Sequence, residues 1–182
     1  MARIITGTAK NKNLTSPDIP EFRAVQEIAK SAVFSMLGES ILGKSFLDLF
    51  AGSGNMGIEA LSRGADWCDF VDTNKKSVEA VEKNLKNCNL REKAEIYQQE
   101  AVKFVANSPE KYDFIFVDPF YNDVKHKYLM ELIPNILNPN GVVIFFHGGN
   151  LNIQEILQNT SLEVFDSRRY GKSYVDFLRK KN

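Results

Sequence analysis

The sequence predicts an α/β fold built on a mostly parallel sheet, and three observations lead to this prediction. From Ser45 onward, short apolar runs alternate with amphipathic segments, which is the repeating strand and helix pattern of such folds. The runs FIFV (114–117) and VVIFF (142–146) are apolar on both faces, as expected of strands that helices cover on both sides. A glycine-rich turn lies directly between the first run and the helix that follows it.

The expected core elements follow one another along the central part of the chain. Strands are expected at 46–50, 66–72, 94–98, 112–118 and 141–146. Apolar residues at helical spacing predict the intervening helices, which lie after Asn55, around Val78 to Leu85, from Ala101 to Val105 and from Leu129 to Ile136. Right-handed crossovers bring the carboxyl ends of such strands to one edge of the sheet, where ligands bind.

The two ends of the chain add elements around this core. Runs at 2–6 and 12–16 predict a short N-terminal β-hairpin, and a helix follows that ends at Gly38. After a helix around Ile156, two strand-like runs joined near YGKS (170–173) predict an antiparallel hairpin at the sheet edge. We therefore expect one domain of residues 1–182 with a seven-stranded, mostly parallel sheet, divided into an N-terminal arm and helix (1–40) and a core (41–182).

Composition limits the classes of function that the chain can have. Twenty-three basic and 23 acidic side chains give a formal charge of zero, so a polyanion must be bound by a local patch. Cys68 and Cys88 do not form a CxxC pair, and no secretion signal follows Met1, which favours a cytoplasmic protein with free thiols. The longest apolar run is far too short to span a bilayer.

Gly52, Gly54 and Gly57 form a G-x-G-x-x-G pattern between a strand and a helix, which we call the glycine loop. Asp72 ends the next strand, where a carboxylate accepts hydrogen bonds from ribose hydroxyls. Glycines allow close approach of a ligand to the backbone, and the helix start offers N–H groups to an anion. The pattern predicts a nucleoside pocket but does not distinguish NAD from S-adenosylmethionine. The alternative is a tight turn that only packs the helix on the sheet.

The strand at 112–118 ends in the turn Asp118, Pro119, Phe120 and Tyr121, which predicts a second half of the site. The nitrogen of an exocyclic amine on a nucleobase is a weak nucleophile, because its lone pair is delocalised into the ring. The Asp118 carboxylate and the backbone carbonyl near Pro119 are acceptors that can hold the amine hydrogens and stabilise developing positive charge. Tyr121 or Phe120 is placed to stack on a base turned out of its helix or loop.

Two further observations bear on this turn. It contains no cysteine, which argues against ring-carbon methylation through a thiolate and favours a nitrogen target. The alternative is an ordinary strand-ending turn whose rings pack in the core. His126 and His147 are the only histidines, and without a second imidazole or cysteine at ligand spacing no metal site is expected.

With these motifs in place, the chain resembles the RsmD family, bacterial methyltransferases that act on the exocyclic amine of one guanine in 16S ribosomal RNA. RIITGTAKNKNLTSP (3–17) is similar to the family's opening arm RIIGGKYKGRKL, and FLDLFAGSGNMGIEALSRGA (46–65) is similar to its cofactor loop. VDPFY (117–121) is similar to its DPPY or DPPF catalytic turn, and RRYGKSYVDFLRK (168–180) to its closing hairpin. The similarity extends over nearly the whole chain, and the arm and hairpin carry most of the specificity.

The resemblance implies a Rossmann-like class I S-adenosylmethionine-dependent methyltransferase acting on RNA, with 16S ribosomal RNA in an assembling small ribosomal subunit as its partner. It implies a cofactor pocket made by Asp48, Gly52, Gly54, Asp72, Glu100, Ala101 and Asp118. It also implies that Asp118, Pro119 and Tyr121 are catalytic, and that Phe120, Tyr121 and Arg23 contact the substrate. Phe120 stands where the family has its second proline, FRAV (22–25) replaces TRPT, Ile28 replaces an arginine, and His147 replaces an acid.

Three other functions remain open from the sequence. The same turn suits an adenine amino-methyltransferase acting on DNA, although the chain offers no separate target-recognition domain. A non-catalytic nucleotide-binding or RNA-binding module and an NAD-dependent dehydrogenase share the glycine loop. A phosphate-contacting rim is also predicted, with the alternative that these charges are merely solvated, from Arg3, Lys10, Lys12, Arg23, Lys30, Arg168, Arg169 and Lys172.

Overall fold

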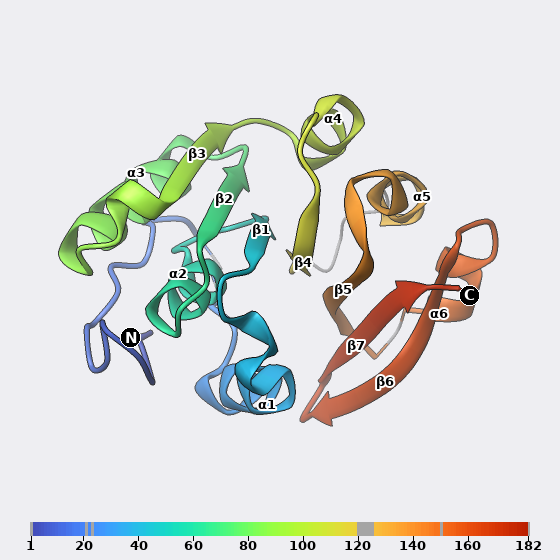
Figure 1. The fold of residues 1–182 in the computed structure, drawn as a ribbon, viewed down its shortest axis with the longest axis horizontal. Coiled ribbons are helices and arrows are strands. Elements are labelled where there is room, and N and C mark those ends of the chain that lie inside the picture. Colours follow the sequence, from blue (N-terminus) through green and yellow to red (C-terminus); the bar gives the residue numbers. More distant parts are fainter. Residues whose placement is uncertain (1, 21, 23, 120–125, 150, 182) are drawn as a thin grey trace.

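The computed structural model describes residues 2–20, 22, 24–119, 126–149 and 151–181. Within these residues, one seven-stranded sheet has the strand order β3-β2-β1-β4-β5-β7-β6 (Figure 1). Its strands are β1 (Ser45–Leu49), β2 (Trp67–Asp72), β3 (Ala94–Gln98), β4 (Tyr112–Val117), β5 (Leu137–Gly148), β6 (Leu162–Tyr170) and β7 (Ser173–Lys180). Strands β1 to β5 pair in parallel, whereas β7 is antiparallel to both β5 and β6. The predicted sheet and its closing hairpin are confirmed.

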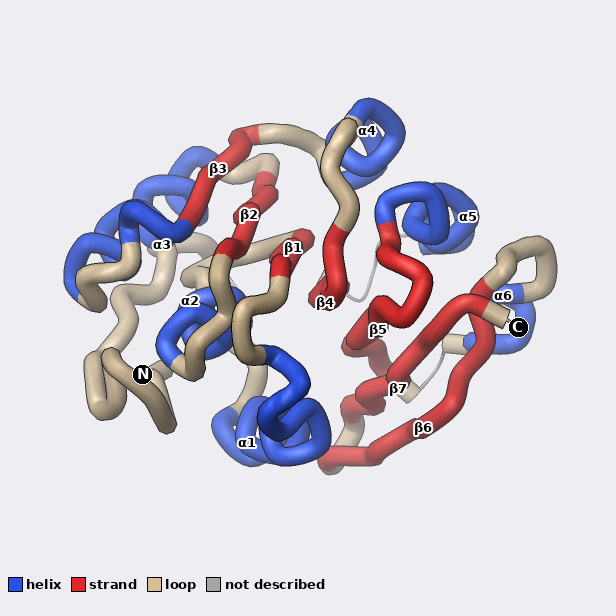
Figure 2. The backbone as a smooth tube through the Cα atoms, in the orientation of Figure 1, coloured by secondary structure: helices blue, strands red, loops and turns tan. Residues whose placement is uncertain are grey.

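Helices cover both faces of the sheet (Figure 2). On one face, the first core is formed with α1 (Glu27–Leu37), α2 (Asn55–Ser62) and α3 (Lys75–Asn87). On the other face, the second core is formed with α4 (Ala101–Asn107), α5 (His126–Ile136) and α6 (Ile153–Leu157). Short 3-10 helices lie at Gly38–Ile41 and Arg91–Lys93.

The pleat of the central strands divides their apolar side chains between the two cores. In β1, Phe46 packs in the first core and Leu47 in the second, and both are fully buried. In β4, Phe116 packs in the first core and Ile115 packs in the second. Each such side chain contributes about 1.5–3 kcal/mol when fully buried. Helices on both faces therefore explain why these strands carry apolar side chains on both of their faces.

The N-terminal arm, residues 2–26, forms less of a hairpin than its sequence predicts. A single antiparallel bridge joins Arg3 to Asn13 in place of two paired strands. Ile4 N donates to Lys12 O at 2.9 Å and Leu14 N donates to Ala2 O at 2.8 Å, so a short hairpin is present around this bridge. The backbone N–H groups of Ile5 and Thr6 donate to the Glu59 carboxylate of α2, at 2.8 and 3.1 Å, so a buried acceptor on the core satisfies them.

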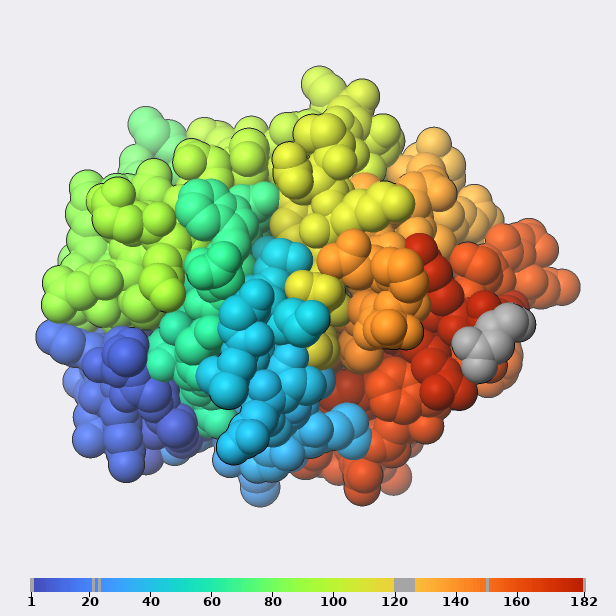
Figure 3. All heavy atoms as spheres, in the orientation of Figure 1, coloured from blue at the N-terminus to red at the C-terminus, as the bar shows by residue number. Residues whose placement is uncertain are grey.

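The arm packs against the helices of the first core. Ala9 N donates to Ser62 Oγ of α2 at 2.9 Å, and Thr15 N donates to Asn84 Oδ1 of α3 at 2.8 Å. Figure 3 shows the arm, in dark blue, lying directly against the green part of the molecule that contains these helices. Its Leu14 side chain is fully buried in the first core. The division of a single domain into residues 1–40 and 41–182 stays a prediction.

Strand β5 starts earlier than the predicted 141–146. It begins at Leu137, which pairs with Tyr112, and the register then shifts between Tyr112 and Phe114. Asn138 Nδ2 donates to Asp113 Oδ1 at 3.0 Å, and this contact holds the added segment beside β4.

No helix in the described residues has both the length and the apolar content that a membrane span requires.

Candidate active site

The carboxyl ends of β1, β2 and β4 bring the predicted site segments to one edge of the sheet. Leu49 of β1 pairs in parallel with Val71 of β2 and with Val117 of β4. The glycine loop directly follows Leu49, while Asp72 and Asp118 directly follow the other two residues. All three segments therefore lie at the same level, with the glycine loop between the two carboxylates. This edge is where ligands bind in open α/β sheets.

The glycine loop turns sharply into α2 through residues in the left-handed region. Gly52 has φ of 56° and Gly54 has φ of 74°, values that glycine adopts without steric cost. Gly54 N donates to Ala51 O at 2.7 Å, and Gly57 N donates to a carboxylate oxygen of Asp48 at 2.9 Å. Asp48 thus fastens the first turn of α2 to the end of β1.

Gly57 is required for a different reason from the first two glycines. A Cβ atom at this position would lie 2.4 Å from the ring of Phe70 and 2.7 Å from Cys68 Sγ. Helix α2 therefore approaches β2 more closely than any larger residue allows. The pattern G-x-G-x-x-G is explained position by position, by two turn glycines followed by one packing glycine.

Asp72 is in direct contact with the glycine loop. One carboxylate oxygen accepts the N–H of Gly52 at 2.9 Å, and the other accepts the N–H of Asn74 at 2.9 Å. The side chain is partly exposed at the edge of the sheet. Each carboxylate oxygen carries two lone pairs, so both retain acceptor capacity for ribose hydroxyls.

The carboxyl groups of Asp48 and Asp118 at this edge both have raised pKa values. Asp48 is buried, and burial raises the pKa of its carboxyl well above the usual range, against the opposing effect of the Gly57 N–H. The nearby Asp118 and Asp72 carboxylates raise this pKa further. Removal from solvent raises the pKa of Asp118 to about 7, although part of its side chain remains exposed. Pro119, which follows it, is buried.

The residues of the glycine loop fit an adenosine cofactor such as S-adenosylmethionine. Ser53 Oγ is buried and has no hydrogen-bond partner among the described residues, so the loop offers one unsatisfied polar atom. The ring of Phe22 lies against Gly52, where an added Cβ atom would be 2.6 Å from Phe22 Cε2. Phe22, the first residue of the FRAV stretch that stands in place of TRPT, thus forms a wall of the loop. An open backbone, an acceptor at Asp72 and an apolar wall match the parts of such a ligand.

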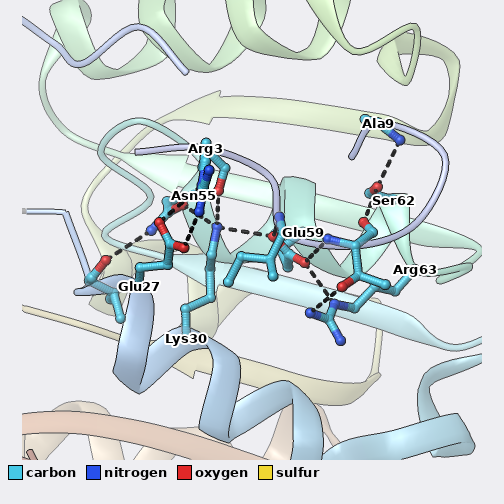
Figure 4. A network of polar contacts seen from close by, with 12 residues as sticks. Arg3, Ala9, Glu27, Lys30, Asn55, Glu59, Ser62 and Arg63 are labelled. Atoms are coloured by element: carbon cyan, nitrogen blue, oxygen red, sulfur yellow. Dashed lines mark hydrogen bonds and ion pairs between the residues drawn. The ribbon is translucent and has the colours of Figure 1, made fainter. Parts of the chain in front are cut away.

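A buried network ties the arm and α1 to the start of α2 (Figure 4). Lys30 Nζ donates to Asn55 Oδ1 at 2.8 Å and to the Arg3 carbonyl at 2.6 Å, and it lies 3.0 Å from the Glu59 carboxylate. Asn55 Nδ2 donates in turn to the carbonyl of Val25 at 3.2 Å. A cavity of about 290 Å³, lined by arm and α1 residues and by Asn55, adjoins this network. The residue that follows Gly54 is therefore positioned from the arm.

This network corrects one expectation from the sequence. Lys30 was expected in an exposed phosphate-contacting rim, but it is 1% exposed and ion-paired with Glu59, which is 0% exposed. Burial lowers the pKa of Lys30, and the Glu59 carboxylate acts in the opposite direction. Glu59 also accepts Arg63 Nε at 2.7 Å, so the carboxylate is surrounded by donors. Lys30 is a structural cation and does not belong to the rim.

Comparisons with known proteins now decide the family. The family model described as Conserved hypothetical protein 95 matches residues 2–179 of the chain. The chain is 32% identical over 184 residues to "Putative rRNA methyltransferase YlbH" of Bacillus subtilis, covering 98% of this chain and 99% of the relative. It is 31% identical over 139 residues to "Ribosomal RNA small subunit methyltransferase D" of Escherichia coli, covering 76% of this chain and 68% of that relative.

The chain belongs to the RsmD family. A solved structure titled "Putative methyltransferase yhhF from Escherichia coli" superposes with a TM-score of 0.84 at 21% identity, covering 98% of this chain and 97% of that one. This likeness shows a shared fold, so the predicted Rossmann-like class I methyltransferase fold is confirmed along with the family.

Several residues that the RsmD resemblance implied can now be placed. Gln98 pairs with Asp72, so Glu100 and Ala101 follow β3 at the same edge as the glycine loop. Glu100 is exposed directly before α4, and Ala101 is its buried first residue. Arg23, Phe120 and Tyr121 lie outside the described residues, so their roles stay predictions.

Sequence reasoning missed the polar residues that position this RsmD site. Asn55, Lys30 and Glu59 lie on two different helices, and neither sequence spacing nor a motif joins them. One signal was available, because Glu59 interrupts the otherwise apolar run from Ile58 to Leu61. A charged residue within a buried helical run indicates a buried partner.

Proposed function

We propose that this RsmD-family protein transfers a methyl group from S-adenosylmethionine to the exocyclic amine of a guanine in 16S ribosomal RNA. One observation carries the proposal. The glycine loop lies between the carboxylates of Asp72 and Asp118 at the carboxyl edge of the sheet, and both lie close enough to Asp48 to raise the pKa of its carboxyl. A dehydrogenase or a binding module gives Asp118 no comparable role.

The cofactor supplies an electrophilic methyl group on a sulfonium. Asp72 would accept hydrogen bonds from its ribose hydroxyls, and the N–H groups at the start of α2 would face its anionic end. Glu100 and Ala101 follow β3 at the same edge, next to Asp72 and its strand, and we assign them to the adenine ring. Asp48 keeps the loop in place through Gly57, so we assign it an indirect role in cofactor binding.

Asp118 would act on the amine of the target base. Its carboxylate and the backbone carbonyl near Pro119 accept the amine hydrogens, which orients the nitrogen lone pair and stabilises positive charge on the nitrogen as its bond to carbon forms. The amine proton then leaves to solvent or transiently to Asp118. A pKa of about 7 keeps this carboxyl near the midpoint of its titration at neutral pH, which suits a group that transiently accepts a proton. Stacking by Tyr121 or Phe120 belongs to the same proposal.

The choice of substrate rests on the relatives. One is named as an rRNA methyltransferase, and another as a methyltransferase of the small-subunit ribosomal RNA. We infer an RNA target of the same kind, in a small ribosomal subunit during cytoplasmic assembly. Methylation of adenine in DNA is the alternative that the Asp118 turn equally permits.

The test compares nucleic acids side by side. Unmodified 16S RNA, made by transcription and offered alone or reconstituted with small-subunit proteins, is incubated with S-adenosylmethionine carrying a deuterated methyl group. Plasmid DNA is treated in parallel, and the nucleosides are analysed by mass spectrometry. We expect labelled N2-methylguanosine from the RNA. Labelled methyladenine from the DNA would establish the alternative, and cofactor binding without transfer to any substrate would identify a non-catalytic module.

A further inference from the structure

The end of β6 and the turn that joins it to β7 carry a cluster of basic side chains, which we call the basic tip. It consists of Arg168, Arg169 and Lys172, and all three are exposed. The chain as a whole has no net charge, so affinity for a polyanion has to come from a local surface of this kind.

Sheet topology places the basic tip at the edge that carries Asp118. Val117 of β4 pairs in parallel with Phe145 of β5, and Gly148 at the end of β5 pairs antiparallel with Ser173 of β7. The turn before Ser173 therefore projects from the carboxyl edge, slightly beyond the level of Asp118. Strands β7 and β6 lie two and three places from β4, which corresponds to about 10 and 14 Å at the usual strand spacing.

The ion pairing within the basic tip leaves it with a net positive charge. Arg168 is paired with Asp166 at 2.9 Å, whereas among the described residues neither Arg169 nor Lys172 is paired with a carboxylate. Several exposed cations elsewhere have a carboxylate partner, as in the pairs Arg3–Glu27, Lys76–Asp18 and Arg179–Glu163. The basic tip instead carries a local excess of positive charge.

A rigid column of rings supports the guanidinium of Arg169. It lies 5.7 Å from the ring of Tyr174, which stacks on His147 at 5.6 Å, and His147 stacks on Phe145 at 5.1 Å. Arg169 Nε donates to the carbonyl of Gly171 at 3.0 Å, which fixes the side chain to its own turn. A cation held in this way loses less entropy when it binds an anion.

The buried base of this column is fixed by hydrogen bonds between strands. His147 is 5% exposed, and its Nε2 lies 2.8 Å from a carboxylate oxygen of Asp176, which is 2% exposed. Ser167 Oγ donates to the other oxygen of Asp176 at 2.5 Å. These contacts join β5, β7 and β6 beneath the tip, so its position relative to the catalytic edge is set by the sheet.

We propose that the basic tip binds backbone phosphates of the RNA strand that carries the target base. This inference rests on the proposed function and adds the surface that recognises the substrate. The axial rise per nucleotide of one strand is about 3.4 Å in a stacked helix, so a separation of about 10–14 Å along the axis spans roughly three to four nucleotides. The contacted phosphates thus lie close to the methylated nucleotide and contribute affinity without reading its sequence.

The test uses two variants with the same change in charge. The tip variant carries Arg168→Gln, Arg169→Gln and Lys172→Gln. The control variant carries Lys93→Gln, Lys111→Gln and Arg179→Gln, which remove three exposed cations at the opposite edge, before β3, before β4 and near the end of β7. The dissociation constant for unmodified 16S RNA is measured by filter binding between 0.05 and 0.3 M KCl, together with the steady-state constants for methyl transfer.

Loss of three phosphate contacts predicts a clear result. The slope of log affinity against log salt should become shallower by about 2 in the tip variant, and the dissociation constant at 0.1 M salt should rise roughly 10- to 100-fold. KM for RNA should rise in parallel, with kcat and the dissociation constant for S-adenosylmethionine nearly unchanged. The control variant should keep the slope of the wild type.

A second variant separates charge from structure. Arg168→Lys with Arg169→Lys keeps both charges and should keep the slope, whereas a purely structural role of these arginines predicts a loss of affinity at constant slope. Wild-type transfer to RNA combined with an unchanged slope in the tip variant overturns this inference alone. Absence of wild-type transfer to any RNA overturns the proposed function and this inference with it.

Discussion

The ammonium of Lys30 lies 3.0 Å from the carboxylate of Glu59, and neither side chain is more than 1% exposed. The pair joins α1 to α2 at the point where Asn55 follows the glycine loop. It also fixes the arm, because Lys30 binds the carbonyl of Arg3 while Glu59 accepts N–H groups from the arm. The shape of the glycine loop therefore depends on a segment that makes no part of the sheet.

Replacement of Lys30 by methionine should destabilise the protein strongly. The change leaves the Glu59 carboxylate buried without its main counter-charge, and breaking such a pair on one side costs about 3–5 kcal/mol. Urea unfolding measures the loss. The control is Lys76→Met, which breaks the exposed pair with Asp18 and should cost about 0–1 kcal/mol. Equal losses of unfolding free energy in both variants would show that the buried pair contributes no more to stability than the exposed pair.

Gly57→Ala should weaken both the fold and cofactor binding. The added methyl group would clash with Phe70 and Cys68, so α2 must move away from β2, at a cost of about 1–3 kcal/mol. Because α2 carries the glycine loop, the dissociation constant for S-adenosylmethionine should rise at least about fivefold, as measured by calorimetry. Gly43→Ala is the control, since that position also disfavours alanine, with φ of 68°, but lies before β1. Unchanged affinity in Gly57→Ala would contradict the packing role.

Asp118→Asn should stabilise the protein at alkaline pH while it removes activity. The pKa of Asp118 is raised to about 7 in the fold, so the folded state holds its proton more tightly than the unfolded chain does. This contribution to stability is complete below the unfolded pKa, about 4, and is lost as the pH rises through 7. Asparagine carries no charge to bury, so the variant should gain in Tm relative to wild type at pH 8 and much less at pH 5.

The exposed Asp18→Asn variant is measured in parallel as the control for the change of an aspartate to asparagine. A Tm difference for Asp118→Asn that is the same at both pH values would mean that the pKa of Asp118 is not raised.

The same ionisation predicts that kcat/KM of the wild type falls as the pH drops below about 7, because the protonated carboxyl loses acceptor capacity.

The parts of the molecule that the sequence predicted are those governed by local patterns. Strands β1 and β4 were predictable because their apolar runs face a core on each side. The shared edge of Asp72 and Asp118 was predictable because parallel strands end at one side of a sheet. These rules require no knowledge of which side chains meet.

The features that the sequence did not predict depend on contacts between distant segments. The short hairpin of the arm lies against α2, where Glu59 accepts the N–H groups of Ile5 and Thr6. Lys30 was predicted to be a surface cation, but the ion pair between α1 and α2 buries it against Glu59. His147 and Asp176 lie on neighbouring strands that only the closing hairpin brings together.

The single-turnover rate of methyl transfer by Asp118→Ala tests the central claim most directly. Unmodified 16S RNA is the substrate, and calorimetry on the same preparation confirms that S-adenosylmethionine still binds. The variant lacks the acceptor that holds the amine beside the glycine loop, so the rate should fall at least about 100-fold with cofactor affinity retained. A rate within about twofold of wild type would contradict the assignment of Asp118 as the catalytic carboxylate.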